Sequence, residues 1–217
     1  MTKPVATTVA ETRVRPWALA AYAAIGWALF TLTILHVVSS YDPMLDTLSR
    51  YAFTDHGVGM LEASLVSLAI GVVAVRGALH VAGVPLSRST SVLFTATAAG
   101  LVAAALFPAS FSPDIHPLVG RVHQLGSAVA FLSLPIIGLA LLDGLRGHPA
   151  LAEVRTALVC VLSLSWNGLA LFGVSYFMDV FPVGLTQRLV LLVDFALLAT
   201  FLALALRAAR ARRTSVR

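Results

Sequence analysis

Six apolar runs, separated by short polar connections, repeat along the whole chain. Each run is about 20 residues long, enough for an α-helix to cross a bilayer's hydrocarbon core, which is about 30 Å thick. The runs are Trp17–Ser39, Met60–Val81, Ser89–Phe107, Leu118–Leu142, Val154–Phe177 and Leu185–Leu206. This pattern predicts an all-α integral membrane protein, in which residues 17–206 form one six-helix transmembrane bundle between tails at 1–16 and 207–217.

The composition supports a membrane protein over a soluble one. The chain is 59% hydrophobic and 12% charged, whereas a soluble domain carries about 25% charged residues. The net charge of +5 arises from cations at the ends of the apolar runs and in the tails, as the positive-inside rule predicts. We therefore expect the lipid bilayer, and no nucleic acid, as the partner of these charges. The oligomeric state is left open.

The position of the cations also predicts the orientation. Lys3, Arg13 and Arg15 precede the first run, and five arginines follow the last one. Because an even number of spans returns the chain to its starting side, both tails are predicted to be cytoplasmic. The predominance of Arg over Lys suggests a bacterial protein, so the expected location is the bacterial plasma membrane.

Three arginines fall on the predicted outer side, where topology selects against cations: Arg50, Arg121 and Arg188. A guanidinium suits phosphate and carboxylate groups. These arginines therefore predict an outward-facing polar pocket, among the second, fourth and sixth helices, that binds an anionic amphiphile or lipid headgroup. The polar residues expected to complete the binding site are Asp114, Gln124 and Gln187.

The first outer connection predicts a short helix on the membrane surface. Asp42 followed by Pro43 is typical of a helix N-terminus, and apolar residues then recur at helical spacing as far as Tyr51. Asp46 and Arg50 are four residues apart and can form an ion pair on one face of that helix.

Three ionisable residues lie within or near the predicted spans and are candidate catalytic groups. Asp194 is ten residues past Gly184, which places it about 15 Å deep, near the middle of the bilayer. A charge is costly there, so its carboxyl must be protonated, paired or hydrated. His123, one turn into the fourth helix, is a candidate base. Glu62, near the start of the second, is a candidate acid that needs a cationic partner such as Arg121 or Arg188.

Three passages resemble a known family. The family's D-x-x-S turn is similar to Asp46-Thr47-Leu48-Ser49-Arg50. Its FP…D…H passage is similar to Leu106-Phe107-Pro108 followed by Asp114 and His123. The G-x-x-[QE]-R start of its last helix is similar to Gly184-Leu185-Thr186-Gln187-Arg188. The family is domain of unknown function 998, polytopic bacterial membrane proteins. The resemblance implies about six helices and marks Pro108, His123 and Arg188 as shared positions, without implying a reaction.

Four functions remain open at this point. The first is the lipid-binding module described above. The second is a membrane enzyme in which Asp194 or Glu62 acts as acid and His123 as base, isomerising or cyclising an isoprenoid or polyketide chain. The third is a b-type cytochrome with haem held between His36 and His123. The fourth is a structural or accessory protein without a ligand. The lone Cys160 excludes a cysteine metal cluster, and no metal site is predicted.

Overall fold

All six predicted spans are α-helices, and the described part of the chain contains no β-strand. The computed structural model describes residues 5–54, 56–111, 116–148, 151–178 and 180–214, with only the backbone at 5–11 and 213–214. The helices are α1 (Val5–Val38), α2 (Met60–Val81), α3 (Arg88–Leu106), α4 (Pro117–Gly144), α5 (Ala152–Met178) and α6 (Val183–Thr214), with a short 3-10 helix, η1 (Leu48–Phe53), between α1 and α2. Each α-helix is long and apolar enough to cross a membrane, which confirms the predicted six-helix membrane fold.

The first and last helices extend beyond the apolar runs. α1 begins at Val5 and includes Pro16, while α6 continues as far as Thr214. The extension of α6 is rich in Ala and Arg, which are strong helix formers, so the helix does not end where the apolar run does.

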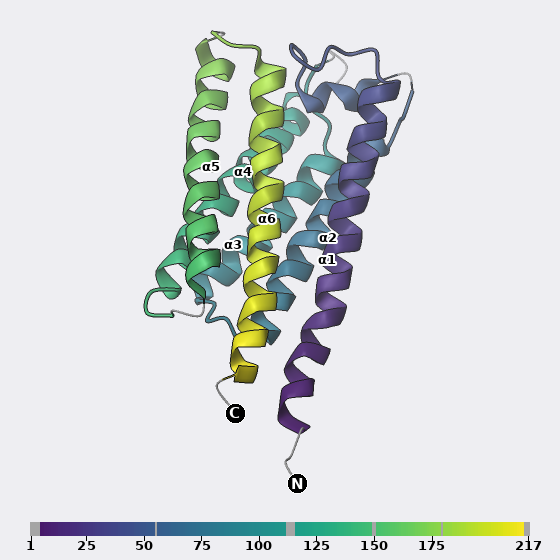
Figure 1. Cartoon of the computed structure of the whole chain (residues 1–217). Helices are drawn as coiled ribbons and strands as arrows, with labels where there is room; N and C mark the ends of the chain where they lie inside the picture. Colours follow the sequence, from purple (N-terminus) through teal and green to yellow (C-terminus); the bar gives the residue numbers. More distant parts are fainter. Residues whose placement is uncertain (1–4, 55, 112–115, 149–150, 179, 215–217) are drawn as a thin grey trace.

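The helices lie side by side, and α1 begins at the same end of the bundle at which α6 ends (Figure 1). The opposite end, which carries η1 and the starts of α2, α4 and α6, is called the distal end below. α5 lies at the edge: 17% of its apolar stretch is buried, against 50% for α2 and α6. The interior is therefore formed mainly by the other five helices.

The expected surface helix in the first connection is much shorter than predicted. The side chain of Asp42 accepts a hydrogen bond from the Met44 N–H (2.7 Å), as expected of a capping residue, but regular helix begins only at Leu48. The Met44 carbonyl instead accepts the N–H of Leu185 at the start of α6 (3.0 Å). This bond holds the segment before η1 against the start of α6.

Glycines bring α3 and α4 into close contact. A Cβ added at Gly100 would lie 2.5 Å from the carbonyl oxygen of Gly126, and a Cβ at Gly126 would lie 2.7 Å from that of Gly100. Small residues allow two backbones to approach in this manner inside a membrane. The contact fixes the distal half of α4 beside the end of α3, where His123 finds its partners.

Candidate functional site

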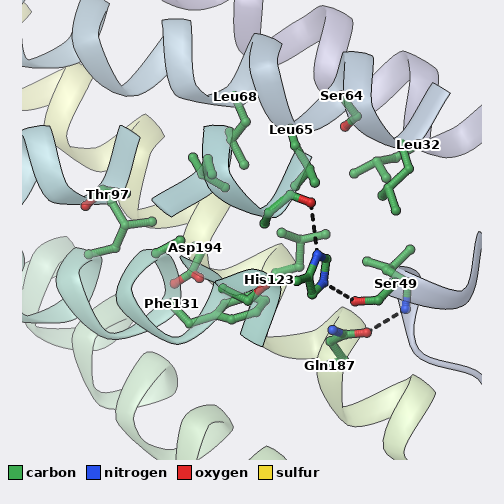
Figure 2. A pocket seen from close by; sticks show the side chains of 18 residues that line it. Leu32, Ser49, Ser64, Leu65, Leu68, Thr97, His123, Phe131, Gln187 and Asp194 are labelled. Carbon is green, nitrogen blue, oxygen red and sulfur yellow. Dashed lines mark hydrogen bonds between the residues drawn. The ribbon is translucent and has the colours of Figure 1, made fainter. Parts of the chain in front are cut away.

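A cavity of about 60 Å³ lies in the distal half of the bundle and is called the distal pocket here (Figure 2). Side chains of η1 and of every α-helix other than α5 line it. Leucines, Phe131 and Ala130 form most of its wall. Its polar lining residues are Ser49, Ser64, Thr97, His123, Ser127, Gln187 and Asp194. The predicted pocket among the second, fourth and sixth helices thus has a counterpart, with α1, α3 and η1 contributing as well.

His123 is held by the end of α3. Its Nδ1 lies 2.9 Å from the Ala104 carbonyl oxygen and 2.8 Å from that of Phe107. The carbonyl of Ala104 is free because the residue four positions later, which would normally donate to it, is Pro108 and has no N–H. A carbonyl can only accept, so Nδ1 carries the proton, and Nε2 of the neutral ring is left as an acceptor.

The Nε2 atom of His123 faces the hydroxyl of Ser49. The two atoms are 2.9 Å apart, and with Nε2 as acceptor the hydroxyl donates (Figure 2). Both residues line the distal pocket, His123 being buried and Ser49 half-buried. The structure therefore places a hydroxyl, an imidazole of fixed tautomer and a cavity next to one another, although the residues lie on η1 and α4.

The start of α6 holds η1 in position beside the pocket. Gly184 lies against the turn that precedes η1, where an added Cβ would be 2.5 Å from the carbonyl oxygen of Asp46. Three residues further along α6, the side-chain oxygen of Gln187 accepts the Leu48 N–H (2.7 Å). Because that bond uses the oxygen end of the amide, the NH₂ end of Gln187 points back towards the pocket (Figure 2).

Arg188 fastens α1, η1 and α6 to one another. Its Nε donates to Nε2 of His36 (2.7 Å), and its Nη1 donates to the carbonyl oxygens of Asp46 and Gly184 (2.8 Å each). Its guanidinium carbon lies 5.1 Å from the centre of the Tyr51 ring, within range of a cation–π interaction. Arg188 does not line the distal pocket; its partners are His36, two backbone carbonyls and the Tyr51 ring.

Tyr51 is the aromatic centre of this cluster. Its ring stacks on that of Tyr41 at 5.7 Å and meets the His36 ring edge-on at 5.1 Å. Burial raises the pKa of the Tyr51 phenol above its ordinary value, and the positive charge of Arg188 opposes that rise. A phenol that is neutral at physiological pH fits this tightly packed position.

Asp194 lies in the deep part of the distal pocket and is 3% exposed. It follows Gln187 by seven residues, so it is about 10 Å deeper along α6. In Figure 2 it lies beside Phe131, beyond His123 as seen from Ser49. Its Oδ1 atom is buried and has no hydrogen-bond partner among the described residues. A carboxyl in such a place is neutral or accepts hydrogen bonds from a molecule in the cavity.

Other predicted site residues lie away from the pocket. Arg121 and Gln124 are exposed on α4, and Arg50 is exposed, forming the predicted ion pair with Asp46 (2.7 Å). Asp114 lies outside the described residues. None of the three arginines lines the distal pocket.

The predicted ion pair of Glu62 is wrong. Its Oε2 is buried without a hydrogen-bond partner, and neither Arg121 nor Arg188 pairs with it within the described part of the chain. Arg188 is instead occupied by His36 and backbone carbonyls. Glu62 does not line the distal pocket.

The two histidines proposed for haem belong to separate networks. Nδ1 of His36 lies 2.6 Å from the Leu32 carbonyl oxygen and its Nε2 accepts from Arg188. His123 likewise uses both ring nitrogens, one towards α3 and one towards Ser49. An iron between them would have to displace Arg188 and Ser49 from these nitrogens.

Ser49 is the site residue that the sequence did not single out. It occurs in the Asp46–Arg50 passage, but a serine beside a charged pair has no distinctive pattern. A usable signal was Pro108, because a proline just after a helix leaves a carbonyl free for a donor such as His123. That signal locates His123 but not the partner of its second nitrogen.

The family resemblance is confirmed by comparison with known families. Comparison with curated proteins and with solved structures finds no match. The three passages that carried the resemblance meet at the distal end, where Asp46 and Gly184 are in contact and Ser49 bonds to His123. The model of the family described as "Protein of unknown function (DUF998)" matches residues 22–213, so this polytopic membrane protein belongs to that family.

Proposed function

We propose that this protein binds a hydrophobic, lipid-like molecule by inserting the molecule's uncharged polar end into the distal pocket. The observation that carries this proposal is the cavity itself, which has mostly apolar walls but contains the unpartnered Oδ1 of Asp194. A buried polar atom without a partner is costly, and a ligand hydroxyl or amide that donates to it relieves that cost.

The size of the cavity indicates which part of a ligand it accepts. Its volume of about 60 Å³ is well below the roughly 300–1,000 Å³ of pockets that enclose a whole drug-sized ligand. One water needs about 10–15 Å³ measured in this way, so there is room for a group of a few heavy atoms. The hydrocarbon part of the ligand then lies outside this cavity, in contact with the bilayer or with displaced leucine side chains.

The chemistry of the lining favours a neutral group over an anionic one. The groups that reach the cavity are hydroxyls, an amide, an imidazole and a carboxyl. A phosphate or carboxylate would lie near Asp194 without the arginine partners that such an anion prefers. The ligand is therefore an amphiphile, as the sequence predicts, but its polar end is an ester, alcohol or amide and not an anionic headgroup.

The proposed orientation places this pocket on the outer side of a bacterial plasma membrane. Arg13, Arg146 and Arg207 lie at the end of the bundle opposite the pocket, as expected for a cytoplasmic face. The ligand then enters from the outer leaflet.

Molecules that co-purify with the protein in mild detergent test this proposal. In Ser127→Leu a larger side chain fills the cavity, whereas the same change at Ser163 adds an exposed leucine on α5. Mass spectrometry should find a lipid-like molecule with the wild type and with Ser163→Leu, reduced at least about tenfold in Ser127→Leu. Equal retention by both variants, or a folded wild type that carries nothing, would contradict ligand binding and favour a purely structural role.

A further inference from the structure

We propose that Ser49 is a nucleophile activated by His123, and that the distal pocket cleaves or transfers the acyl group of an amphiphilic carboxylic ester. This inference rests on the proposed function, because it assumes that the polar end of a lipid-like molecule enters the pocket. It names that polar end as an ester and assigns it a reaction.

The geometry is that of an activated nucleophile. Such sites need a hydroxyl within about 2.6–3.2 Å of a base, and a third group that orients the base. Ser49 Oγ is 2.9 Å from Nε2 of His123, and the carbonyl oxygens of Ala104 and Phe107 hold Nδ1. Those carbonyls fix the tautomer in which Nε2 can accept the proton of the hydroxyl.

The pocket also supplies a place for the reacting carbonyl and a donor for its oxygen. The cavity begins beside Ser49 and His123 and is large enough for an ester group. The Gln187 NH₂ faces the same space, and the bond between its side-chain oxygen and the Leu48 N–H fixes which way the amide points. A donor held next to the nucleophile can stabilise the negative charge that develops on a carbonyl oxygen under attack.

The depth of the pair suits a membrane ester. α4 has 28 residues, about 42 Å at 1.5 Å each, which matches a bilayer including its interfacial layers. His123 is six residues from the start of α4, or about 9 Å, and each interfacial layer is about 5–7 Å thick. The Ser49–His123 pair is therefore near the boundary between headgroups and hydrocarbon, the level at which the ester groups of lipids lie.

The reaction divides into two balanced steps. Ser49 Oγ attacks the ester carbonyl while its proton passes to Nε2 of His123; the C–O bond to the alcohol then breaks, and His123 returns the proton to the departing alkoxide. In the second step water, or the hydroxyl of another amphiphile, attacks the acyl-serine and gives its proton to His123. The bond between the acyl carbon and Ser49 Oγ then breaks, His123 returns its proton to Oγ to restore the hydroxyl, and the acid or new ester leaves. Asp194 takes no proton in either step and contacts the ligand at the deep end of the pocket.

A long-chain alkyl fluorophosphonate tests the proposal, because an activated serine displaces its fluoride and retains a phosphonyl group that mass spectrometry can locate. The intact protein in nanodiscs should be modified at Ser49, and the Ser49→Ala variant should not. Modification should be at least about 100-fold slower in His123→Asn, since a general base contributes about 10²–10⁴-fold. A methyl fluorophosphonate should react more slowly than the long-chain probe.

A cysteine variant covers the case in which His123→Asn does not fold. With Cys160 replaced by serine, the thiol of Ser49→Cys should react with iodoacetamide at neutral pH at least about tenfold faster than that of Ser127→Cys, because both positions are half-buried in the pocket but only Ser49 is hydrogen-bonded to the imidazole. Equal rates for these two thiols, or an unmodified Ser49 in the wild type, would overturn the proposal.

The outcomes separate this inference from the proposed function. An unreactive Ser49 in a protein that still retains its lipid-like molecule would refute acyl transfer and leave binding intact. An unreactive Ser49 in a protein that retains no such molecule would refute both.

Discussion

Replacing Arg188 with alanine should destabilise the bundle by about 2–3 kcal/mol. The change removes three hydrogen bonds and the contact with the Tyr51 ring. Hydrogen bonds inside membrane proteins contribute about 0.6 kcal/mol on average, whereas hydrogen bonds from charged groups in soluble proteins contribute about 1.5–3 kcal/mol. A value of about 1 kcal/mol for each of the three hydrogen bonds in this half-buried site gives about 3 kcal/mol, and the cation–π contact adds about 1 kcal/mol.

Part of this loss of stability is offset, because not every guanidinium nitrogen of Arg188 has a hydrogen-bond partner among the described residues. Its Nη2 atom is buried without a hydrogen-bond partner among the described residues, and removing such a group recovers about 1–2 kcal/mol. The net expectation is the 2–3 kcal/mol given above. Arg188→Lys should lose about half as much, since an ammonium keeps the charge but cannot donate in the planar pattern of a guanidinium.

Equilibrium unfolding in mixed micelles, followed by circular dichroism, measures these differences. Arg207→Ala is the matched control, because Arg207 forms an exposed ion pair with Glu153, and such pairs contribute about 0–1 kcal/mol. If Arg188→Ala lost no more stability than Arg207→Ala, the interpretation of Arg188 as the fastening residue of the distal end would be refuted. A stable Arg188→Ala variant that had lost its ligand would instead restore Arg188 as a binding residue.

Three further predictions concern the neighbourhood of the pocket. Gly184→Ala should cost about 1–3 kcal/mol in the same unfolding assay, because its Cβ would lie 2.5 Å from the Asp46 carbonyl oxygen; an unchanged stability would contradict that close approach. Nitrogen NMR of His123 should show the proton on Nδ1, because the carbonyl oxygens of Ala104 and Phe107 both accept from that atom; a proton on Nε2 alone would contradict this tautomer. Tyr51 should titrate above its ordinary pKa of 10.0. Because the neutral form of Tyr51 is favoured in the folded state, the stability it contributes is complete below that value and is lost as pH rises through the folded pKa. In Tyr51→Phe the free energy of unfolding should therefore fall less steeply at alkaline pH. The same alkaline fall in the variant and the wild type would contradict this prediction.

The sequence motif at the start of α6 identifies residues of the distal end, but not the contact that each residue makes. Gly184, Gln187 and Arg188 were visible as a motif, but their tasks differ: close approach to Asp46, a bond to the Leu48 N–H, and the link to His36. No periodicity distinguishes these tasks, because each depends on a group from a distant part of the chain.

The charged residues give the clearest contrast between expectation and structure. The sequence correctly paired Asp46 with Arg50, which are four residues apart on one short segment. It failed for Glu62, whose expected arginine partners lie on other helices. Spacing within a segment fixes local pairs, but the rotation of one helix against another depends on packing.

The sequence by itself determined the class of protein, the six apolar spans and the position of Asp194 within the last of them. These properties follow from hydrophobicity and from the rise per residue of a helix, both of which are local. The tertiary structure alone decided that Arg188 bonds to His36 and to backbone carbonyls, that Arg121 is exposed on α4, and that Ser49 meets His123. The reason is physical: within a bilayer, helices are arranged by close packing and a few polar contacts, and one glycine contact such as that between Gly100 and Gly126 decides which side chains share a cavity.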